Sequence, residues 1–401
     1  MSTTTPVPAA TAGTRVPRVV PVLALSIFAL GTSEFLIAGL LPAMAADLDV
    51  GIQQIGYLIS AFAVGMIVGA PAMAVLTLRL PRRTTLVAML LVVIAAHLAG
   101  AVAQSYPLLL AVRVVTAVAT GGFWAVAAVV TVSSVGPSAR ARALSWLLAG
   151  LTVANVAGIP LGTVVGQALG WRVAFAMVAV LAAVGLAGVL LSVPGATPSS
   201  APPRLSHEVA AFRRGRLWLA LGTTALYQAA AMATAAYVAP LLIDVAGLAP
   251  GWVPVVQFGF GAGGLAGITI GGRIADARPW ATLFSALVAA AVLLAVLGVA
   301  GGEPVVAVTA LVALGLIAFV AAAPLNARVF ALAGAAPTLA GSTNTSAFNV
   351  GNALGPALGG LAIGAGWGMT SPVLIGVGLM VGSVVLASAS FVLDRRRGAP
   401  G

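Results

Sequence analysis

The chain has 401 residues, of which 61% are hydrophobic and only 7% are charged. Soluble domains carry about 25% charged residues, so this composition excludes an ordinary soluble protein and predicts a multi-pass membrane protein. The net charge of +11 comes from arginine alone, and the chain has no cysteine, which excludes disulfides and thiolate metal sites. In a membrane protein we expect such a charge to follow topology rather than to bind nucleic acid.

Twelve apolar runs follow a polar tail at residues 1–18, and each is close to the ~20 residues that a spanning helix needs. We expect the first run to be a retained helix rather than a signal peptide, because it is too long and lacks a small-residue cleavage site. The expected helices lie at about 19–41, 54–77, 84–103, 107–132, 143–167, 172–193, 217–243, 252–275, 280–300, 305–328, 339–363 and 371–393.

A polar, proline-rich and basic stretch separates two sets of six predicted helices. The expected units are a tail at 1–18, a first half at 19–193, a cytoplasmic linker at 194–216, a second half at 217–393 and a tail at 394–401. The halves also share residues at a slowly drifting offset of 196–198, which predicts two pseudo-symmetric six-helix units. The matched pairs include Phe62 with Phe260, Gly65 with Gly263, Gly69 with Gly267, Asn155 with Asn352, Gly158 with Gly355 and Gly162 with Gly359.

Arginine placement predicts the orientation. If the N-terminus is cytoplasmic, 17 of the 19 arginines fall in cytoplasmic segments, whereas Arg172 is in an outer loop and Arg113 is inside a run. This bias is the positive-inside signature. We therefore expect a protein of the cell membrane with both termini in the cytoplasm.

Glu34, in the segment GTSEFLIAGLLP at residues 31–42, is the only acidic side chain inside an apolar run. A carboxylate in hydrocarbon costs about 2.5–3.5 kcal/mol on insertion scales and usually marks an ion or substrate path. A protonated glutamate bonded to a neighbouring helix is the alternative. We predict that Glu34 carries a coupling proton, and that Arg113, at similar depth in its own helix, tunes Glu34 or the substrate.

Two further patterns point to moving parts. Loops rich in arginine after the second and eighth helices are candidate gates, although Leu78 stands where the first copy should have an aspartate; their residues are Arg79, Arg82, Arg83, Gly272, Arg273, Asp276 and Arg278. Helices five and eleven carry glycines and prolines that permit close helix packing and kinks; these are Gly158, Pro160, Gly162, Gly351, Gly355, Pro356, Gly359 and Gly360.

Together these motifs, from about residue 19 to 393, resemble the major facilitator superfamily and its twelve-helix drug:proton antiporters. The segments at 31–42, 60–71, 170–172 and 335–342 are similar to those of actinobacterial chloramphenicol exporters, and the first and third also to arabinose-efflux-type permeases. The resemblance implies an all-α integral membrane protein with the major facilitator fold, alternating access, gating loops, and glycine-rich helices at the interface between the halves.

Other polar and aromatic residues inside the runs could line a substrate cavity, or could simply bond or pack against neighbouring helices. They are Phe35, Phe62, Phe123, Trp124, Asn155, Tyr227, Gln228, Asn349 and Asn352. His97 is alone in its helix and is assigned a structural role. The chain has no nucleotide-binding loop of the GxxxxGK type, so ATP-driven transport is not expected.

The function predicted from the sequence is proton-coupled efflux of small neutral amphiphilic drugs, with chloramphenicol-type antibiotics as leading candidates. One embedded carboxylate and one embedded arginine leave no surplus negative charge for a cationic drug. A sugar or metabolite exporter on the same fold is the alternative, and an integral membrane enzyme is a remote one because a single embedded acid offers no catalytic pair. The expected partners are the drug, protons and lipid; no cofactor, metal or nucleic acid is expected, and the chain should be a monomer.

Overall fold

The computed structural model of the protein describes residues 17–77, 80–136, 139–194, 215–333 and 337–396, and every regular element in these ranges is helical. Most of each predicted tail and nearly all of the predicted linker lie outside these residues. The first half contains α1 Val19–Phe35, η1 Leu36–Gly39, α2 Leu41–Leu48, α3 Ile52–Leu76, α4 Arg82–Ala101, α5 Tyr106–Ser133, α6 Arg140–Val153, η3 Ala154–Gly158, α7 Ile159–Leu169 and α8 Trp171–Ser192. The second contains α10 Gly215–Ala235, α11 Val238–Pro240, η5 Leu241–Val245, α12 Trp252–Ala277, α13 Pro279–Ala300, α14 Pro304–Ala333, α15 Pro337–Gly364 and α16 Ser371–Arg395.

Each of the twelve apolar runs falls on helix. Ten helical segments are long and apolar enough to cross a membrane, and α10 with the segment after it makes an eleventh that bends by 49°. The remaining run is α15, which is long enough but carries Asn344, Asn349 and Asn352 along its length. A helix with this many amides is stable in a membrane only if other helices surround it.

Three of the predicted spans are broken rather than continuous. The first ends as α-helix at Phe35, passes through the 3-10 turn η1, and restarts as α2, so the prediction of one helix over 19–41 is wrong. The fifth contains the π-turn η3, and the seventh bends after Ala235. The new segments begin with Pro42 and Pro160 in their first turn, where a missing N–H costs no helical hydrogen bond.

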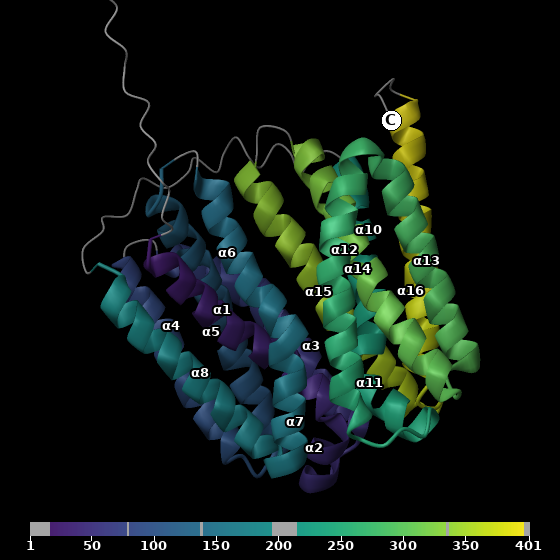
Figure 1. The fold of residues 1–401 in the computed structure, drawn as a ribbon, viewed down its shortest axis with the longest axis horizontal. Coiled ribbons are helices and arrows are strands. Elements are labelled where there is room, and N and C mark those ends of the chain that lie inside the picture. Colours follow the sequence, from purple (N-terminus) through teal and green to yellow (C-terminus); the bar gives the residue numbers. More distant parts are fainter. Residues whose placement is uncertain (1–16, 78–79, 137–138, 195–214, 334–336, 397–401) are drawn as a thin grey trace, which may run out of the picture.

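The same helix contacts recur in both halves, as the sequence repeat predicts. In the first half α1 packs on α6 and α8, α3 on α5, and α4 on α8. In the second half α10 packs on α15 and α16, α12 on α14, and α13 on α16, which are the equivalent pairs. Figure 1 shows the two groups meeting at the end that carries α2, α7 and α11 and diverging toward the end where α6 begins and α16 ends. This second end also carries most of the described arginines and is called the arginine-rich face.

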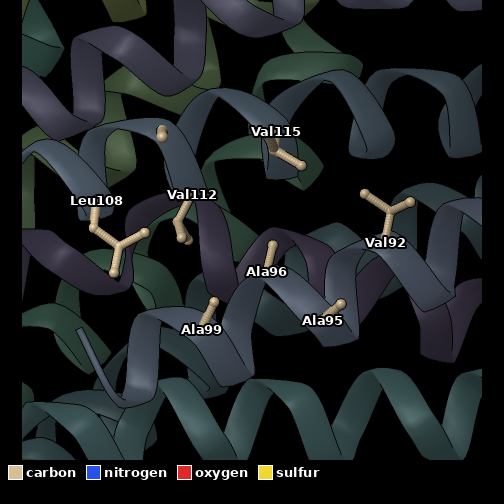
Figure 2. A pocket seen from close by; sticks show the side chains of 8 residues that line it. Val92, Ala95, Ala96, Ala99, Leu108, Val112 and Val115 are labelled. Carbon is tan, nitrogen blue, oxygen red and sulfur yellow. The ribbon is translucent and has the colours of Figure 1, made fainter.

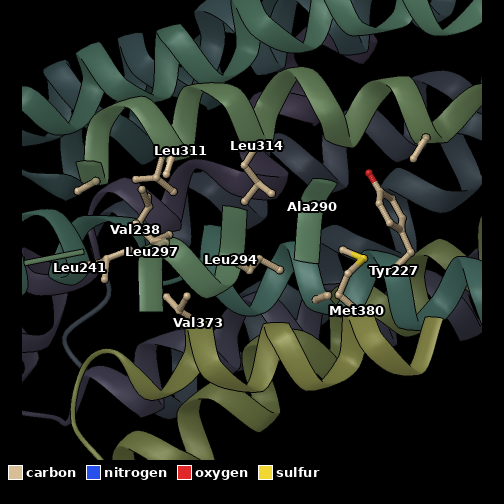
Figure 3. Packing of buried hydrophobic residues seen from close by; sticks show 14 of the residues in the cluster. Tyr227, Val238, Leu241, Ala290, Leu294, Leu297, Leu311, Leu314, Val373 and Met380 are labelled. Carbon is tan, nitrogen blue, oxygen red and sulfur yellow. The ribbon is translucent and has the colours of Figure 1, made fainter. Parts of the chain in front are cut away.

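Each half has its own apolar core. Figure 3 shows that of the second half, where Leu294 and Leu297 of α13 pack with Leu311 and Leu314 of α14. Phe123 of α5 occupies the equivalent interior of the first half. A third apolar cluster spans both halves, because Tyr237 of the second half belongs to the same cluster as Leu40 and Leu41 of the first. The boundary between the halves therefore combines apolar packing with polar contacts.

Candidate functional site

Glu34 lies one residue before α1 ends, at the break that the sequence did not predict. Its side chain is half-buried. The last carbonyls of an α-helix have no intrahelical partners, so a helix that stops inside a membrane must have its end satisfied by other groups. The site around Glu34 is organised by the side chains that satisfy this helix end.

Arg113 of α5 satisfies it. The guanidinium is 1% exposed and donates to the carbonyl oxygens of Ser33 and Glu34, both at 2.9 Å, and more weakly to that of Leu58 at 3.4 Å. Its Cζ lies 4.4 Å above the ring centre of Phe62. A cation at a helix C-terminus is favourable, and this one fixes the direction in which Glu34 leaves the helix.

Arg113 and Glu34 therefore lie close together, as predicted, but the guanidinium contacts the backbone carbonyl of Glu34 rather than its carboxylate. Within the described ranges, no ion pair within 4 Å joins the guanidinium to the Glu34 carboxylate. Phe62 was predicted to line a substrate cavity; it is buried beneath Arg113 instead, and its ring supports that cation.

A buried histidine and serine complete this side of the site. Nδ1 of His97 bonds the carbonyl oxygen of Val93 at 2.9 Å, so this nitrogen carries the hydrogen, and Nε2 accepts from the Ser33 hydroxyl at 2.8 Å. The Ser33 oxygen is in turn free to accept from Arg113 at 3.4 Å. Sequence reasoning missed Ser33 and treated His97 as isolated. The available signal was the histidine itself, a polar group inside an apolar span.

The second half reaches Glu34 from the opposite side. Asn352 of α15 donates from Nδ2 to Oε1 of Glu34 at 3.4 Å, and its own Oδ1 accepts from Nε2 of Gln228 on α10 at 2.7 Å. The structure thus brings together three residues that the sequence singled out in three separate helices. Glu34, Asn352 and Gln228 form a row of hydrogen bonds that crosses from one half to the other.

Other residues predicted to line a cavity are placed elsewhere. Phe123 is fully buried in the first-half core, and Tyr227 is buried in the second-half core with its hydroxyl donating to the Ala318 carbonyl. Both predictions are corrected, because these rings fill the interior of a half rather than the space between halves. Trp124 is half-buried and packs against the first-half core. Phe35, the residue that follows Glu34, is also half-buried.

Two asparagines bond their own helices. Asn155 donates to the Leu151 carbonyl at 3.0 Å, and Asn349 donates to the Thr345 carbonyl at 3.0 Å. These bonds follow the i to i−4 pattern by which a polar side chain satisfies itself inside a helix.

The arginine loops contact their own halves. Arg82 donates to the Ser133 hydroxyl at 2.9 Å and Arg83 to the Leu190 carbonyl at 2.7 Å, which ties the start of α4 to α5 and α8. Arg273 and Arg278 are exposed. Arg79 and the side chain of Asp276 lie outside the described part of the structure, so the predicted latch at Asp276 stays a prediction.

The glycine motifs pack tightly within each half, and Gly360 also faces Tyr57 of α3 in the other half. α15 packs on α3, and η3 and α7 pack on α12, so both motif helices lie at the boundary between the halves. A Cβ added at Gly158 would lie 2.1 Å from the Thr32 hydroxyl of α1, and one at Gly355 would lie 2.4 Å from the Ala229 carbonyl of α10. The other positions behave alike: Gly162 meets Leu36, Gly351 meets α10, and Gly359 and Gly360 meet Tyr237. These glycines let helix five lie on helix one, and helix eleven on helix seven.

Glycines outside these motifs also permit close contact between the halves. A Cβ at Gly261 of α12 would lie 2.6 Å from the Cα of Val156 in the π-turn η3. Nearby, the Thr163 hydroxyl bonds Oε1 of Gln257 at 2.7 Å across the same boundary. These contacts lie at the end opposite the arginine-rich face, where the halves meet in Figure 1.

The first half carries an apolar pocket. Figure 2 shows it between α4 and α5, lined by Val92, Ala96, Leu108 and Val115 among other aliphatic residues. None of the predicted site residues lines it. Among the residues with described side chains, no three His, Cys, Asp or Glu are placed to hold a metal ion.

Comparison with known proteins covers nearly the whole chain. The profile of the Major Facilitator Superfamily matches residues 23–347. The chloramphenicol resistance protein of Streptomyces lividans is 42% identical over 375 residues, which span 92% of this chain and 95% of that protein. The inner membrane transport protein YdhP of Escherichia coli (strain K12) is 35% identical over 350 residues, spanning 87% and 90%.

The fold has a counterpart among solved structures. A bacterial homologue of the human lysosomal transporter Spinster, in an inward-facing and unoccupied conformation, matches with a TM-score of 0.76 over 94% of this chain and 96% of its own, at 17% identity. At that identity the likeness shows the fold alone. The paired six-helix halves, the profile match and the similarity to transport proteins over the full span lead to one assignment: this chain is a multi-pass membrane transporter of the major facilitator superfamily.

Proposed function

We propose that this protein exports small neutral amphiphilic drugs, with chloramphenicol-type antibiotics as the leading class, in exchange for protons. The observation that carries the proposal is the position of Glu34, a carboxyl group at a helix break between the two halves that is contacted from the half to which it does not belong. Transport follows alternating access, with the termini and the arginine-rich face in the cytoplasm, as the positive-inside bias indicates.

The position of Glu34 supports proton coupling by a linkage argument. When the halves rearrange, a group between them gains or loses partners, so the proton affinity of its carboxyl must differ between the two conformations. Linkage is reciprocal, so binding a proton must shift the balance between the conformations. Arg113 contributes by holding the helix end and hence the carboxyl position, rather than by pairing directly with the carboxylate.

Charge supports a neutral substrate. Among the described residues, Glu34 is the acidic side chain in the row of hydrogen bonds between the halves, and the Arg113 cation is committed to backbone carbonyls. A cationic drug would meet no surplus negative charge to offset its desolvation. The Streptomyces lividans relative, named for chloramphenicol resistance, supports the same drug class. Exchanging one proton for one neutral drug moves net charge, so the membrane potential contributes about 2.3 kcal/mol per 100 mV.

The test is expression in a drug-sensitive bacterial host with chloramphenicol and the lipophilic cation ethidium. We expect raised tolerance to chloramphenicol that an uncoupler abolishes. Glu34→Gln should remove uphill export while the protein is still inserted, and Glu303→Gln, the same change at an exposed position, should leave export intact. Protection against ethidium but not chloramphenicol, or full export by Glu34→Gln, would overturn the proposal. Export of a sugar instead would favour the alternative reading of the same fold.

A further inference from the structure

Glu34 contacts the second half through one hydrogen bond, in which the second half supplies the donor and Glu34 the acceptor. Arg113 uses its well-aligned donors on the carbonyls of Ser33 and Glu34, so it leaves the carboxylate to other partners. Among the described side chains, the hydrogen bond to this carboxylate comes from Nδ2 of Asn352, across the boundary between the halves. The partner of the acid is therefore an amide of the other half.

Gln228 determines which end of that amide faces Glu34. Its Nε2 donates to Oδ1 of Asn352 at 2.7 Å, which leaves Nδ2 of Asn352 directed at the acid. Rotating the Asn352 amide would place two N–H groups against each other on one side and two oxygens on the other. The pair therefore presents a donor, which matches an ionised carboxylate and not the hydroxyl of a protonated one.

The close approach of α15 to α10 at Gly351 lets Asn352 and Gln228 bond each other. A Cβ at Gly351 would lie 2.5 Å from the Cβ of Gln228, so only glycine lets α15 approach α10 closely enough beside Asn352. Asn349, a buried amide nearby on the same helix, shows the contrast, because it donates to the Thr345 carbonyl of its own helix. The amide nitrogen of the same residue type thus bonds its own helix at one position and the acid of the other half at the other.

We propose that Asn352 and Gln228 are positioning residues of the proton-coupling site rather than substrate contacts, an inference that rests on the proposed function. While Glu34 is ionised, the amide pair holds it across the boundary and restrains the halves in this conformation. When Glu34 takes up a proton, the bond from the Asn352 amide no longer ends on a charged carboxylate, so it becomes weaker and the restraint on the halves is reduced.

The other charged and titratable groups on this site belong to the first half. They are Arg113 on α5, which bonds the backbone at Glu34, and His97 on α4, which reaches the site only through Ser33. The described parts of α10 and α15 contribute the two amides. Changing these amides therefore alters the restraint from the second half without altering the charge of the site.

The test compares Asn352→Leu and Gln228→Leu with Asn349→Leu, the matched control, in protein reconstituted into vesicles. Chloramphenicol uptake driven by a proton gradient reports coupling, and exchange of labelled for unlabelled chloramphenicol without a gradient reports substrate handling. We expect the first two variants to lose about tenfold of gradient-driven uptake while exchange and KM stay within about threefold, because the lost interaction is not one with substrate. In a Glu34→Gln background neither change should have a further effect.

An infrared measurement needs no substrate. The carboxylate stretch of Glu34, identified by its loss in Glu34→Gln, should shift in Asn352→Leu and Gln228→Leu and stay unchanged in Asn349→Leu. A KM raised about tenfold with loss of exchange would make these residues substrate contacts and overturn the inference. An unshifted band, or full coupling in both variants, would overturn it as well. A shifted band in a protein that moves no chloramphenicol would uphold the inference and reject the proposed drug.

Discussion

Removing the Arg113 side chain should destabilise the protein measurably. Arg113→Ala leaves the carbonyls of Ser33 and Glu34 without their donors and leaves Phe62 without the cation above its ring. Hydrogen bonds in membrane proteins average about 0.6 kcal/mol and reach about 1.7. A desolvated cation–π contact contributes about 2 kcal/mol. Two bonds and one such contact give a loss of about 3–5 kcal/mol, or roughly a 150- to 5,000-fold change in the folded-to-unfolded ratio.

The assay is unfolding in mixed detergent micelles, followed by circular dichroism. Arg113→Lys keeps the charge but loses the planar fork that reaches two carbonyls, so its midpoint should lie between those of Arg113→Ala and the wild type. Arg273→Ala is the control, because this arginine is exposed and a surface substitution changes the free energy of unfolding by about 0.5 kcal/mol or less. If Arg113→Ala unfolds with the wild-type midpoint, the carbonyls of the α1 break do not depend on Arg113 and the reasoning fails.

Two further pairs of substitutions test packing and charge. Gly355→Ala should lower the unfolding midpoint, since the new Cβ would lie 2.4 Å from the Ala229 carbonyl, whereas Gly272→Ala has open space and should leave it unchanged. Asp394→Ala should cost about 3 kcal/mol, because it leaves two largely buried arginines without their shared carboxylate; Asp47→Ala, at a more exposed pair, should stay within about 1 kcal/mol in the same unfolding assay. Equal unfolding midpoints for the two glycine variants would contradict the packing argument. Equal midpoints for the two aspartate variants would contradict the charge argument.

The sequence by itself determined the class of the protein, the positions of its helical runs and the repeat between the halves. These follow from local physics, because a segment in hydrocarbon must satisfy its own backbone and must be apolar over the membrane thickness. It also singled out Glu34, since an acid inside such a run is conspicuous wherever the fold places it. Asn352 and Gln228 were found for the same reason, although no sequence pattern indicated that they meet.

Only the tertiary structure decided how these residues are used. The break after Glu34 depends on Arg113, which is 79 positions away and replaces the helical partners of the carbonyls that the break exposes. The contact between Asn352 and Glu34 spans 318 positions and depends on how closely α15 approaches α10 at Gly351. Periodicity and hydropathy are properties of one segment, whereas the partner of a buried polar group is set by the packing of several helices, so the sequence identified the groups and the fold assigned their partners.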